Sequence, residues 1–151
     1  FAISAANNNV YAAGSFLSIG RVQRDHVAAM DASTGKATSW NPDAEDIVNA
    51  LEFHDGVIYA CGRFTDIGGQ SRHYIAALDT VTGQATSWDP HANSWVTTVA
   101  VSGNTVYAGG QFDSIGGQAR SSIAALDAVT GLATGWNPDA NVYSQYPDVK
   151  A

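Results

Sequence analysis

The sequence predicts an all-β repeat fold made of β-propeller blades, and three observations lead to this prediction. A segment of about 48 residues is written three times, since Tyr11, Tyr59 and Tyr107 follow one another at steps of 48. The recurring segments are short β-prone runs separated by turns rich in glycine. No segment shows sustained helical periodicity. Periods of roughly 20 to 50 residues are typical of stacked or circular repeats, in which no unit buries its apolar face alone.

The first half of each repeat is expected to be a hairpin and a connection, as the third copy illustrates. Residues 99–101 are predicted to form a first strand, and residues 105–110 a second strand, with a Ser-Gly-Asn turn between them. Residues 112–117 are expected to form the next connection. Its paired glycines, Gly116 and Gly117, can take the positive φ values that other residues resist.

Two further strands are expected to complete the blade. Residues 122–127 are predicted to form a third strand ending at Asp127, whose carboxylate can accept hydrogen bonds from turn amides. Residues 132–136 are predicted to form a fourth, outer strand, which ends before Pro138 because proline removes a ladder donor. Four short strands match one propeller blade. The main rival is a β-solenoid, whose coils are usually shorter than this unit.

The repeat predicts three complete four-stranded antiparallel blades, at residues 1–48, 49–96 and 97–144, followed by a tail at 145–151 that leaves the pattern. Propellers typically have about four to eight blades, so three are too few to close a ring. The open ends would expose apolar surface that favours association. We therefore expect either two copies joined head to tail in a six-bladed ring or a part of a larger propeller.

Residues that recur are predicted to be structural. The tryptophans are expected to pack between blades, and the aspartates to order turns. These positions are Trp40, Trp88, Trp136, Asp31, Asp79 and Asp127. A second interpretation of the tryptophans stays open, because aromatic rings beside the amides of Trp-Asn-Pro loops are also a sugar-binding arrangement. Cys61, at a strand position otherwise held by Ala and Gly, is expected to be a buried, inert thiol.

Residues that break the repeat are better candidates for a ligand or an interface. Trp95 is one, because its equivalents are Ile47 and Tyr143, and we expect it to be partly exposed in a connecting loop. A shared packing role is the plainer interpretation, since all three side chains are large. Tyr143 and Tyr146 are the other candidates. Pro147 falls where Val99 lies one period earlier, so no fourth blade is expected to start there.

No catalytic constellation is visible, and we predict that the chain is not an enzyme and has no cofactor. Its histidines do not recur, and their spacing fits no zinc site; they are His26, His54, His73 and His91. The acidic run at 43–46 leaves calcium as an alternative, although it lacks an Asp-x-Asp-x-Asp loop. The net charge of −7 argues against a nucleic-acid partner, and no apolar run is long enough to insert into a membrane.

Two stretches resemble the bacterial propeller repeats often called delta-60. They are Gly-Arg-Phe-Thr-Asp-Ile-Gly-Gly-Gln at 62–70 and Gly-Gln-Phe-Asp-Ser-Ile-Gly-Gly-Gln at 110–118, each followed by Ile-Ala-Ala-Leu-Asp, Thr-Gly and Trp-Asn/Asp-Pro. The first copy departs most, at Leu17, Arg21 and Val22. This resemblance implies a propeller in an exported or surface-associated bacterial protein, and therefore an extracellular or cell-surface location.

A looser likeness is to the tryptophan-docking motif of quinoprotein dehydrogenases, Ala-x-Asp-x-x-Thr-Gly-x-x-x-Trp. The segment from Ala29 to Trp40 is similar to it, with the tryptophan one residue late. In that family the motif locks blades together, so the likeness implies a fold and not a quinone site.

The function expected from the sequence is a non-catalytic structural or interaction module that assembles through its open blade edges. Its expected partners are further copies or the remaining blades of a longer chain, with a glycan or a protein as ligand. A carbohydrate-binding propeller lectin is one alternative. The other is a fragment of a propeller enzyme whose catalytic residues lie in blades outside this sequence.

Overall fold

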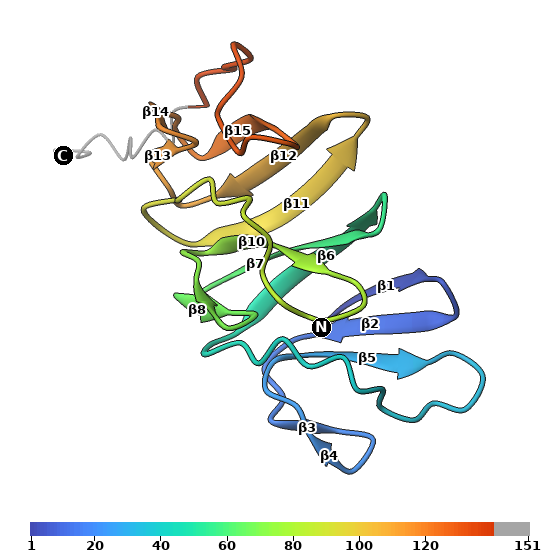
Figure 1. Ribbon diagram of the computed structural model, residues 1–151. Coiled ribbons are helices and arrows are strands. Elements are labelled where there is room, and N and C mark those ends of the chain that lie inside the picture. Colours follow the sequence, from blue (N-terminus) through green and yellow to red (C-terminus); the bar gives the residue numbers. More distant parts are fainter. Residues whose placement is uncertain (141–151) are drawn as a thin grey trace, which may run out of the picture.

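The computed structural model describes residues 1–140, which contain 15 strands and no helix (Figure 1). The strands form three three-stranded antiparallel sheets and three two-stranded hairpins, one of each per repeat unit. An all-β repeat architecture of small antiparallel sheets is therefore confirmed. The strands of unit 1 are β1 (Ala2–Ala6), β2 (Asn9–Ala13), β3 (Ser18–Ile19), β4 (Val22–Gln23) and β5 (Val27–Asp31).

Units 2 and 3 repeat this order. In unit 2 the strands are β6 (Val48–His54), β7 (Val57–Gly62), β8 (Asp66–Ile67), β9 (Gln70–Ser71) and β10 (Ile75–Asp79). In unit 3 they are β11 (Val96–Ser102), β12 (Thr105–Gly110), β13 (Ser114–Ile115), β14 (Gln118–Ala119) and β15 (Ile123–Asp127).

Each three-stranded sheet is a meander with the second strand in the middle. In unit 3, β12 pairs with β11 on one side and with β15 on the other. The predicted turn between the first two strands is present, since Ser102 pairs with Thr105 and Gly103 has a φ of +55°. Tight turns of this kind keep sequential strands adjacent without a crossover.

The prediction of a fourth strand in each unit is wrong. Residues 132–136 form only one isolated antiparallel bridge, between Ala133 and Leu126. Thr134 N still donates to Ala125 O at 2.8 Å, but the pairing ends there. The Thr134 hydroxyl then accepts from Trp136 N at 3.2 Å, which turns the chain away from the sheet edge. The main sheet of each unit therefore has three strands and one isolated bridge at its edge.

A short hairpin that the sequence pattern did not predict begins in the connection predicted at 112–117 and ends just after it. Ser114 and Ile115 of β13 pair with Ala119 and Gln118 of β14. Strands of two residues are too short to show an alternating pattern.

The apolar core lies between units and not within them. One buried cluster joins units 1 and 2, and a second joins units 2 and 3. Every buried member of the first cluster has a counterpart 48 residues later in the second. The first consists of Tyr11, Ala13, Val27, Ala29, Trp40, Ala44, Val48, Leu51, Ile58, Ala60, Phe64, Ile67, Ala76 and Leu78. The junction between units is thus repeated in all its buried positions.

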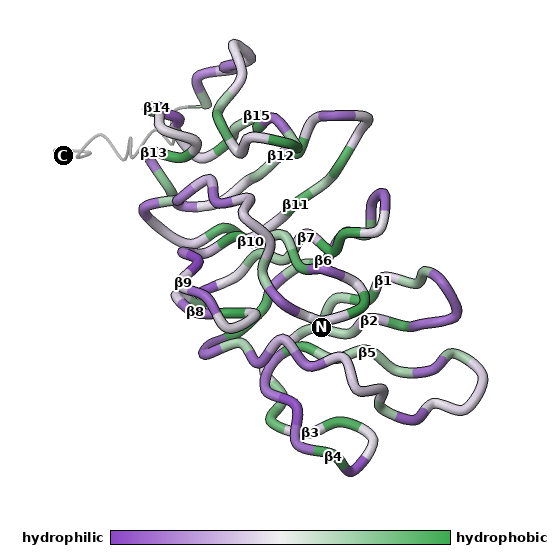
Figure 2. The backbone as a smooth tube through the Cα atoms, in the orientation of Figure 1, coloured by the Kyte–Doolittle hydropathy of each residue, from purple (hydrophilic) through white to green (hydrophobic). Residues whose placement is uncertain are grey.

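Strand alternation explains how one sheet serves two junctions. Successive side chains of a strand point to opposite faces. In β7, Ile58 and Ala60 pack in the first cluster, whereas Tyr59 and Cys61 pack in the second. The middle sheet is therefore buried on both faces. Figure 2 shows hydrophobic residues along the strands and hydrophilic residues at hairpin tips.

Neighbouring sheets approach one another through their first strands. β1 lies against β6, and β6 lies against β11. Figure 1 shows the three sheets following one another in chain order, from blue through green to orange. Within residues 1–140, no helix is long and apolar enough to cross a membrane.

Candidate functional site

Each tryptophan of the repeat joins its own unit to the next one. The indole of Trp40 lies edge-on to the ring of Tyr11, with centroids 5.0 Å apart and planes at 80°. Its Nε1 donates a 2.9 Å hydrogen bond to the backbone carbonyl of Asp79, in unit 2. Trp88 repeats both contacts, with Tyr59 and with the carbonyl of Asp127 at 3.0 Å. Both indoles are buried, so the packing prediction is confirmed for these two.

Backbone hydrogen bonds from the Trp-Asn/Asp-Pro loops strengthen the same junctions. The carbonyl of Pro42 accepts from Gly68 N at 2.7 Å, and the carbonyl of Pro90 accepts from Gly116 N at 2.6 Å. Each bond connects the loop of one unit to the short hairpin of the next. The Glu45 carboxylate adds to the first junction by accepting from the N–H and the hydroxyl of Thr65, both at 3.1 Å.

The third tryptophan departs from this pattern. Trp136 lies edge-on to Tyr107, with centroids 5.5 Å apart, but it is 45% exposed, whereas Trp88 is 4% exposed. The expectation that all three indoles are buried therefore does not hold for Trp136. The reason is physical: Trp40 and Trp88 are covered by the following unit, and residues 1–140 contain no fourth unit. Within this range, no acceptor faces the indole N–H of Trp136. We call the surface around Trp136 and Tyr107 the C-terminal face.

The opposite end of the chain presents the other half of a junction. Ile3 is 71% exposed, although its equivalents Leu51 and Val99 are only 7% and 8% exposed. Phe1, Leu17 and Val22 are exposed on the same unit. We call the surface of unit 1 that includes Ile3 and its apolar neighbours the N-terminal face.

The recurring aspartates order turns, as predicted. Oδ1 of Asp79 accepts from Val81 N at 2.9 Å, and from the N–H and hydroxyl of Thr82 at 2.7 and 2.9 Å. These hydrogen bonds, those of Thr82 foremost, lower the pKa of the Asp79 carboxyl. Asp127 makes the same contacts in unit 3, and its pKa is lowered for the same reason. In unit 1, Asp31 has an additional donor, the Ser33 hydroxyl at 2.6 Å, and its pKa falls from 3.8 to about 2.

A third recurring position was missed by sequence reasoning. Arg24, Arg72 and Arg120 lie 48 residues apart. Each guanidinium donates to the carbonyl of a threonine 14 residues later, at 2.6 to 2.7 Å. Each also donates to the carbonyl of its preceding residue at 2.7 Å. These arginines tie the short hairpin to the segment that was predicted to be a fourth strand. Their regular period was the available signal.

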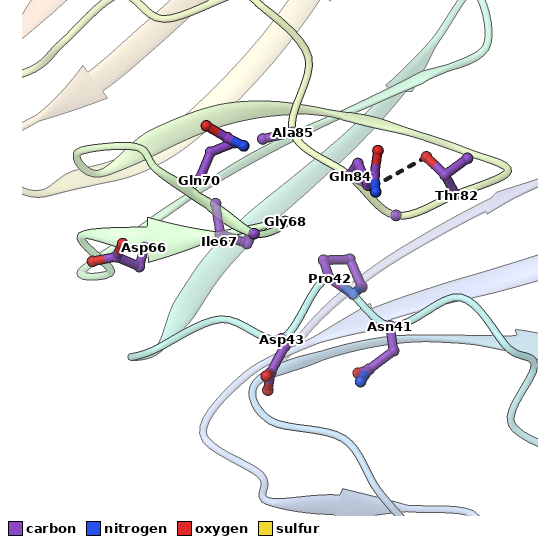
Figure 3. A pocket seen from close by; sticks show the side chains of 12 residues that line it. Asn41, Pro42, Asp43, Asp66, Ile67, Gly68, Gln70, Thr82, Gln84 and Ala85 are labelled. Atoms are coloured by element: carbon purple, nitrogen blue, oxygen red, sulfur yellow. Dashed lines mark hydrogen bonds between the residues drawn. The ribbon is translucent and has the colours of Figure 1, made fainter.

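A polar groove of about 520 Å³ lies where units 1 and 2 meet (Figure 3). One wall is the loop at 41–43, and the other is the turn at 82–85 together with the hairpin β8–β9. The amides of Gln70 and Gln84 belong to its lining. The side chains that line the groove offer hydrogen-bond donors and acceptors. Trp40 is buried and is not one of the lining residues.

Trp95 lies in the loop before β11 and is 38% exposed, in agreement with the sequence expectation. The guanidinium of Arg63 lies 4.3 Å from the centroid of its indole, a cation–π arrangement. Ser15 and Gln111 occupy the position of Arg63 in the other units, so both partners of this pair break the repeat. The other candidates, Tyr143 and Tyr146, lie outside the described residues, as does the tail at 145–151.

Two of the four histidines stack on each other. His73 and His91 stack with centroids 4.7 Å apart and nearly parallel planes. His26 Nδ1 lies 3.2 Å from the carbonyl oxygen of Gly14, and His54 Nε2 lies 3.4 Å from an Asp55 carboxylate oxygen. In the described part of the chain, no three His, Cys, Asp or Glu side chains are grouped so that they could hold a metal ion. Cys61 is fully buried, and burial raises the pKa of its thiol to about 12.

No protein-family model matches the chain, and no curated protein matches it. Two computationally designed proteins of known crystal structure are similar to it in fold. The first, Ika4, has a TM-score of 0.63 and 21% identity over 93% of this chain and 72% of its own. The second, Ika8, has a TM-score of 0.58 and 22% identity over 87% of this chain. The match spans only 34% of the Ika8 chain. At this level of identity the likeness concerns the fold alone.

Proposed function

We propose that this chain is a non-catalytic structural or interaction module, built of β-propeller blades, that assembles through its open end faces. The observation that carries the proposal is the contrast between two equivalent tryptophans. Trp88 is buried at the junction of units 2 and 3, whereas Trp136 is exposed on the C-terminal face. Repeat proteins stay monomeric and soluble when their terminal units present a polar outer face. The two end faces of this chain are apolar, and both match a surface that is buried elsewhere in the same chain.

The sheet arrangement supports blades and not a flat stack. Successive sheets are close at their first strands, β1, β6 and β11, as blades around a common axis would be. A β-solenoid would instead hydrogen-bond equivalent strands of successive coils in continuous sheets, whereas here each unit has its own sheet. The setting proposed for this module is an exported or cell-surface protein of bacterial type, as the repeat resemblance implies.

The mass of the assembled particle tests this function. We expect light scattering at low micromolar concentration to give two chain masses, and negative-stain images to show a ring of six units. A monodisperse particle with the mass of one chain and no partner would contradict the proposal. The monomer would then need another explanation for its two apolar ends.

A carbohydrate-binding lectin is a second candidate function, favoured by the exposed Trp95 and by the polar groove. Exposed indoles stack on sugar rings, and the amides of the groove suit sugar hydroxyls. A glycan array on the wild-type chain is the test. Saturable binding lost in Trp95→Ala would place the sugar at the Trp95–Arg63 pair, and binding lost only in Gln84→Ala would place it in the groove. An array without any hit would count against a lectin.

A further inference from the structure

We infer that a second copy of this chain docks its N-terminal face on the C-terminal face of the first, with the Trp136 indole donating to the backbone carbonyl of Asp31 in the second copy. This inference rests on the proposed function and adds the pair of surfaces, their polarity and the hydrogen bond that joins them. The two internal junctions serve as its template, because they show what covers each face when a neighbouring unit is present.

The buried side chains of a junction come from two units in a constant pattern. The unit before the junction supplies residues such as Tyr59 and Trp88, and the unit after it supplies residues such as Val99. Unit 3 carries the first half of this set unused, including Tyr107 and Trp136. Unit 1 carries the equivalents of the second half, none of which belongs to either core cluster, although Ala12 and Ala28 are already buried. Every member is apolar: Ile3, Val10, Ala12, Phe16, Ile19, Ala28 and Met30. The chain thus contains both halves of a third junction.

The polar contacts of a junction are also split between the two ends. The carbonyls of Asp79 and Asp127 each accept from a turn amide and from a tryptophan of the preceding unit. The carbonyl of Asp31 accepts from Gly35 N at 2.8 Å and, within residues 1–140, from no indole. At the other end, the Trp136 indole N–H has no acceptor in that range. The indole N–H of Trp136 and the carbonyl of Asp31 are therefore each available to a group of the other's kind. An indole N–H and an aspartate carbonyl are the two groups that pair at each internal junction.

The space for the incoming loop is open on unit 1. A Cβ at Gly83 would lie 3.4 Å from backbone atoms of Asn41 and Pro42, because the loop of unit 1 covers this glycine. A Cβ at the equivalent Gly35 would meet nothing within 4 Å. The uncovered Gly35 can therefore receive the loop at Pro138, which is exposed, whereas Pro42 and Pro90 are buried.

A second copy is the occupant favoured by this geometry, because both surfaces are present on one chain at equal concentration. The contact is heterologous, since two different faces meet. A heterologous contact closes into a ring when the rotation between copies allows it. The curvature that brings first strands together within the chain would continue across the contact.

The test uses one variant at each face of the full chain. Trp136→Glu disables the C-terminal face, and Ile3→Asp disables the N-terminal face. Both side chains are exposed in the single chain, so circular dichroism and thermal unfolding should match the wild type at dilution. By light scattering, we expect each variant alone to have the mass of one chain. An equimolar mixture should form a dimer, because each pair retains one intact face of each kind.

The matched control is Val129→Ser. Val129 is an exposed apolar residue of unit 3, and its equivalent Val81 stays 82% exposed in the middle unit, so docking does not cover this position. The control should assemble like the wild type.

The possible outcomes separate the two proposals. A wild-type monomer overturns both, and it would point to the chain's own tail as the cover if Trp136 were shielded from acrylamide quenching. A wild-type assembly that survives both substitutions leaves the proposed function standing and overturns the docking inference. Assembly lost in Trp136→Glu but retained in Ile3→Asp would indicate tail-to-tail contact, and the reverse would indicate head-to-head contact. Either result overturns the head-to-tail arrangement.

Discussion

Trp88 and Trp136 occupy the same repeat position in consecutive units, yet Trp88 is buried and Trp136 is exposed. Both lie edge-on to a tyrosine of their own unit, with similar geometry. The difference is the following unit, which gives Trp88 a hydrogen-bond acceptor and an apolar cover. Local sequence therefore determines the side chain's orientation, and the neighbouring unit determines its burial. Substitutions at a junction and at an end face should accordingly differ in their effects.

The largest expected effect is at the junction tryptophan. Trp88→Ala should lower the free energy of unfolding by about 3–5 kcal/mol, because it leaves a cavity and removes one of the two hydrogen bonds to the Asp127 carbonyl. Trp136→Ala should cost less than about 1 kcal/mol at a dilution where the chain is single, since surface substitutions usually have small effects. Urea denaturation measures both. Equal losses would contradict the assignment of the two environments.

The next effect compares two glycines at the same repeat position. A Cβ at Gly62 would lie 2.1 Å from the carbonyl oxygen of Ile47, in the segment that crosses from unit 1. A Cβ at Gly14 would meet only the ring of Phe1, at 2.9 Å, which can move aside. We expect Gly62→Ala to cost about 3 kcal/mol by overpacking, and Gly14→Ala less than about 1 kcal/mol. Gly110→Ala should behave like Gly62→Ala, since its Cβ would lie 2.2 Å from the Trp95 carbonyl.

The third prediction concerns acid, and it compares the turn of unit 1, which has the Ser33 hydroxyl, with those of units 2 and 3, where Val81 and Val129 take the place of Ser33. The folded-state pKa of Asp31 is about 2, below its ordinary value of 3.8. A lowered pKa means that its contribution to stability is complete above about pH 4 and is lost as the pH falls toward 2. NMR titration should show Ser33→Ala raising the pKa of Asp31, because the first of its donors is removed. Unfolding curves between pH 6 and 2 should then show a smaller loss of stability in this variant, and the loss should be complete at a higher pH. An unchanged titration would refute the role of the Ser33 hydroxyl.

The smallest expected effect is at a turn of the divergent first unit. Arg21 has a φ of +64°, where units 2 and 3 carry Gly69 and Gly117. Arg21→Gly should raise the free energy of unfolding by about 0.5 kcal/mol, since relief of left-handed strain slightly exceeds the entropy cost of glycine. The reverse change, Gly69→Arg, should lower it. Thermal unfolding of the two variants measures the pair, and shifts of the same sign would contradict this explanation.

The features that the 48-residue period determines directly could be predicted from the sequence. The turn aspartates, the hairpin turns and the burial of Trp40 and Trp88 all follow from recurrence together with residue type. Prediction failed where a feature depends on a few atoms or on a neighbour. The strands β13 and β14 are too short to show a pattern, and the fourth strand is ended by the Thr134 hydroxyl, which a propensity argument does not see. The exposure of Trp136 could not be predicted locally, because it depends on whether another unit covers it.

The shared junction has an evolutionary consequence. Because every unit carries one face that gives an indole N–H and one that offers a carbonyl, an in-frame duplication or deletion of 48 residues leaves both termini chemically unchanged. A gene of this kind can lengthen or shorten without a compensating mutation elsewhere. Natural length variants should therefore differ by whole units and retain a tryptophan at the position of Trp136.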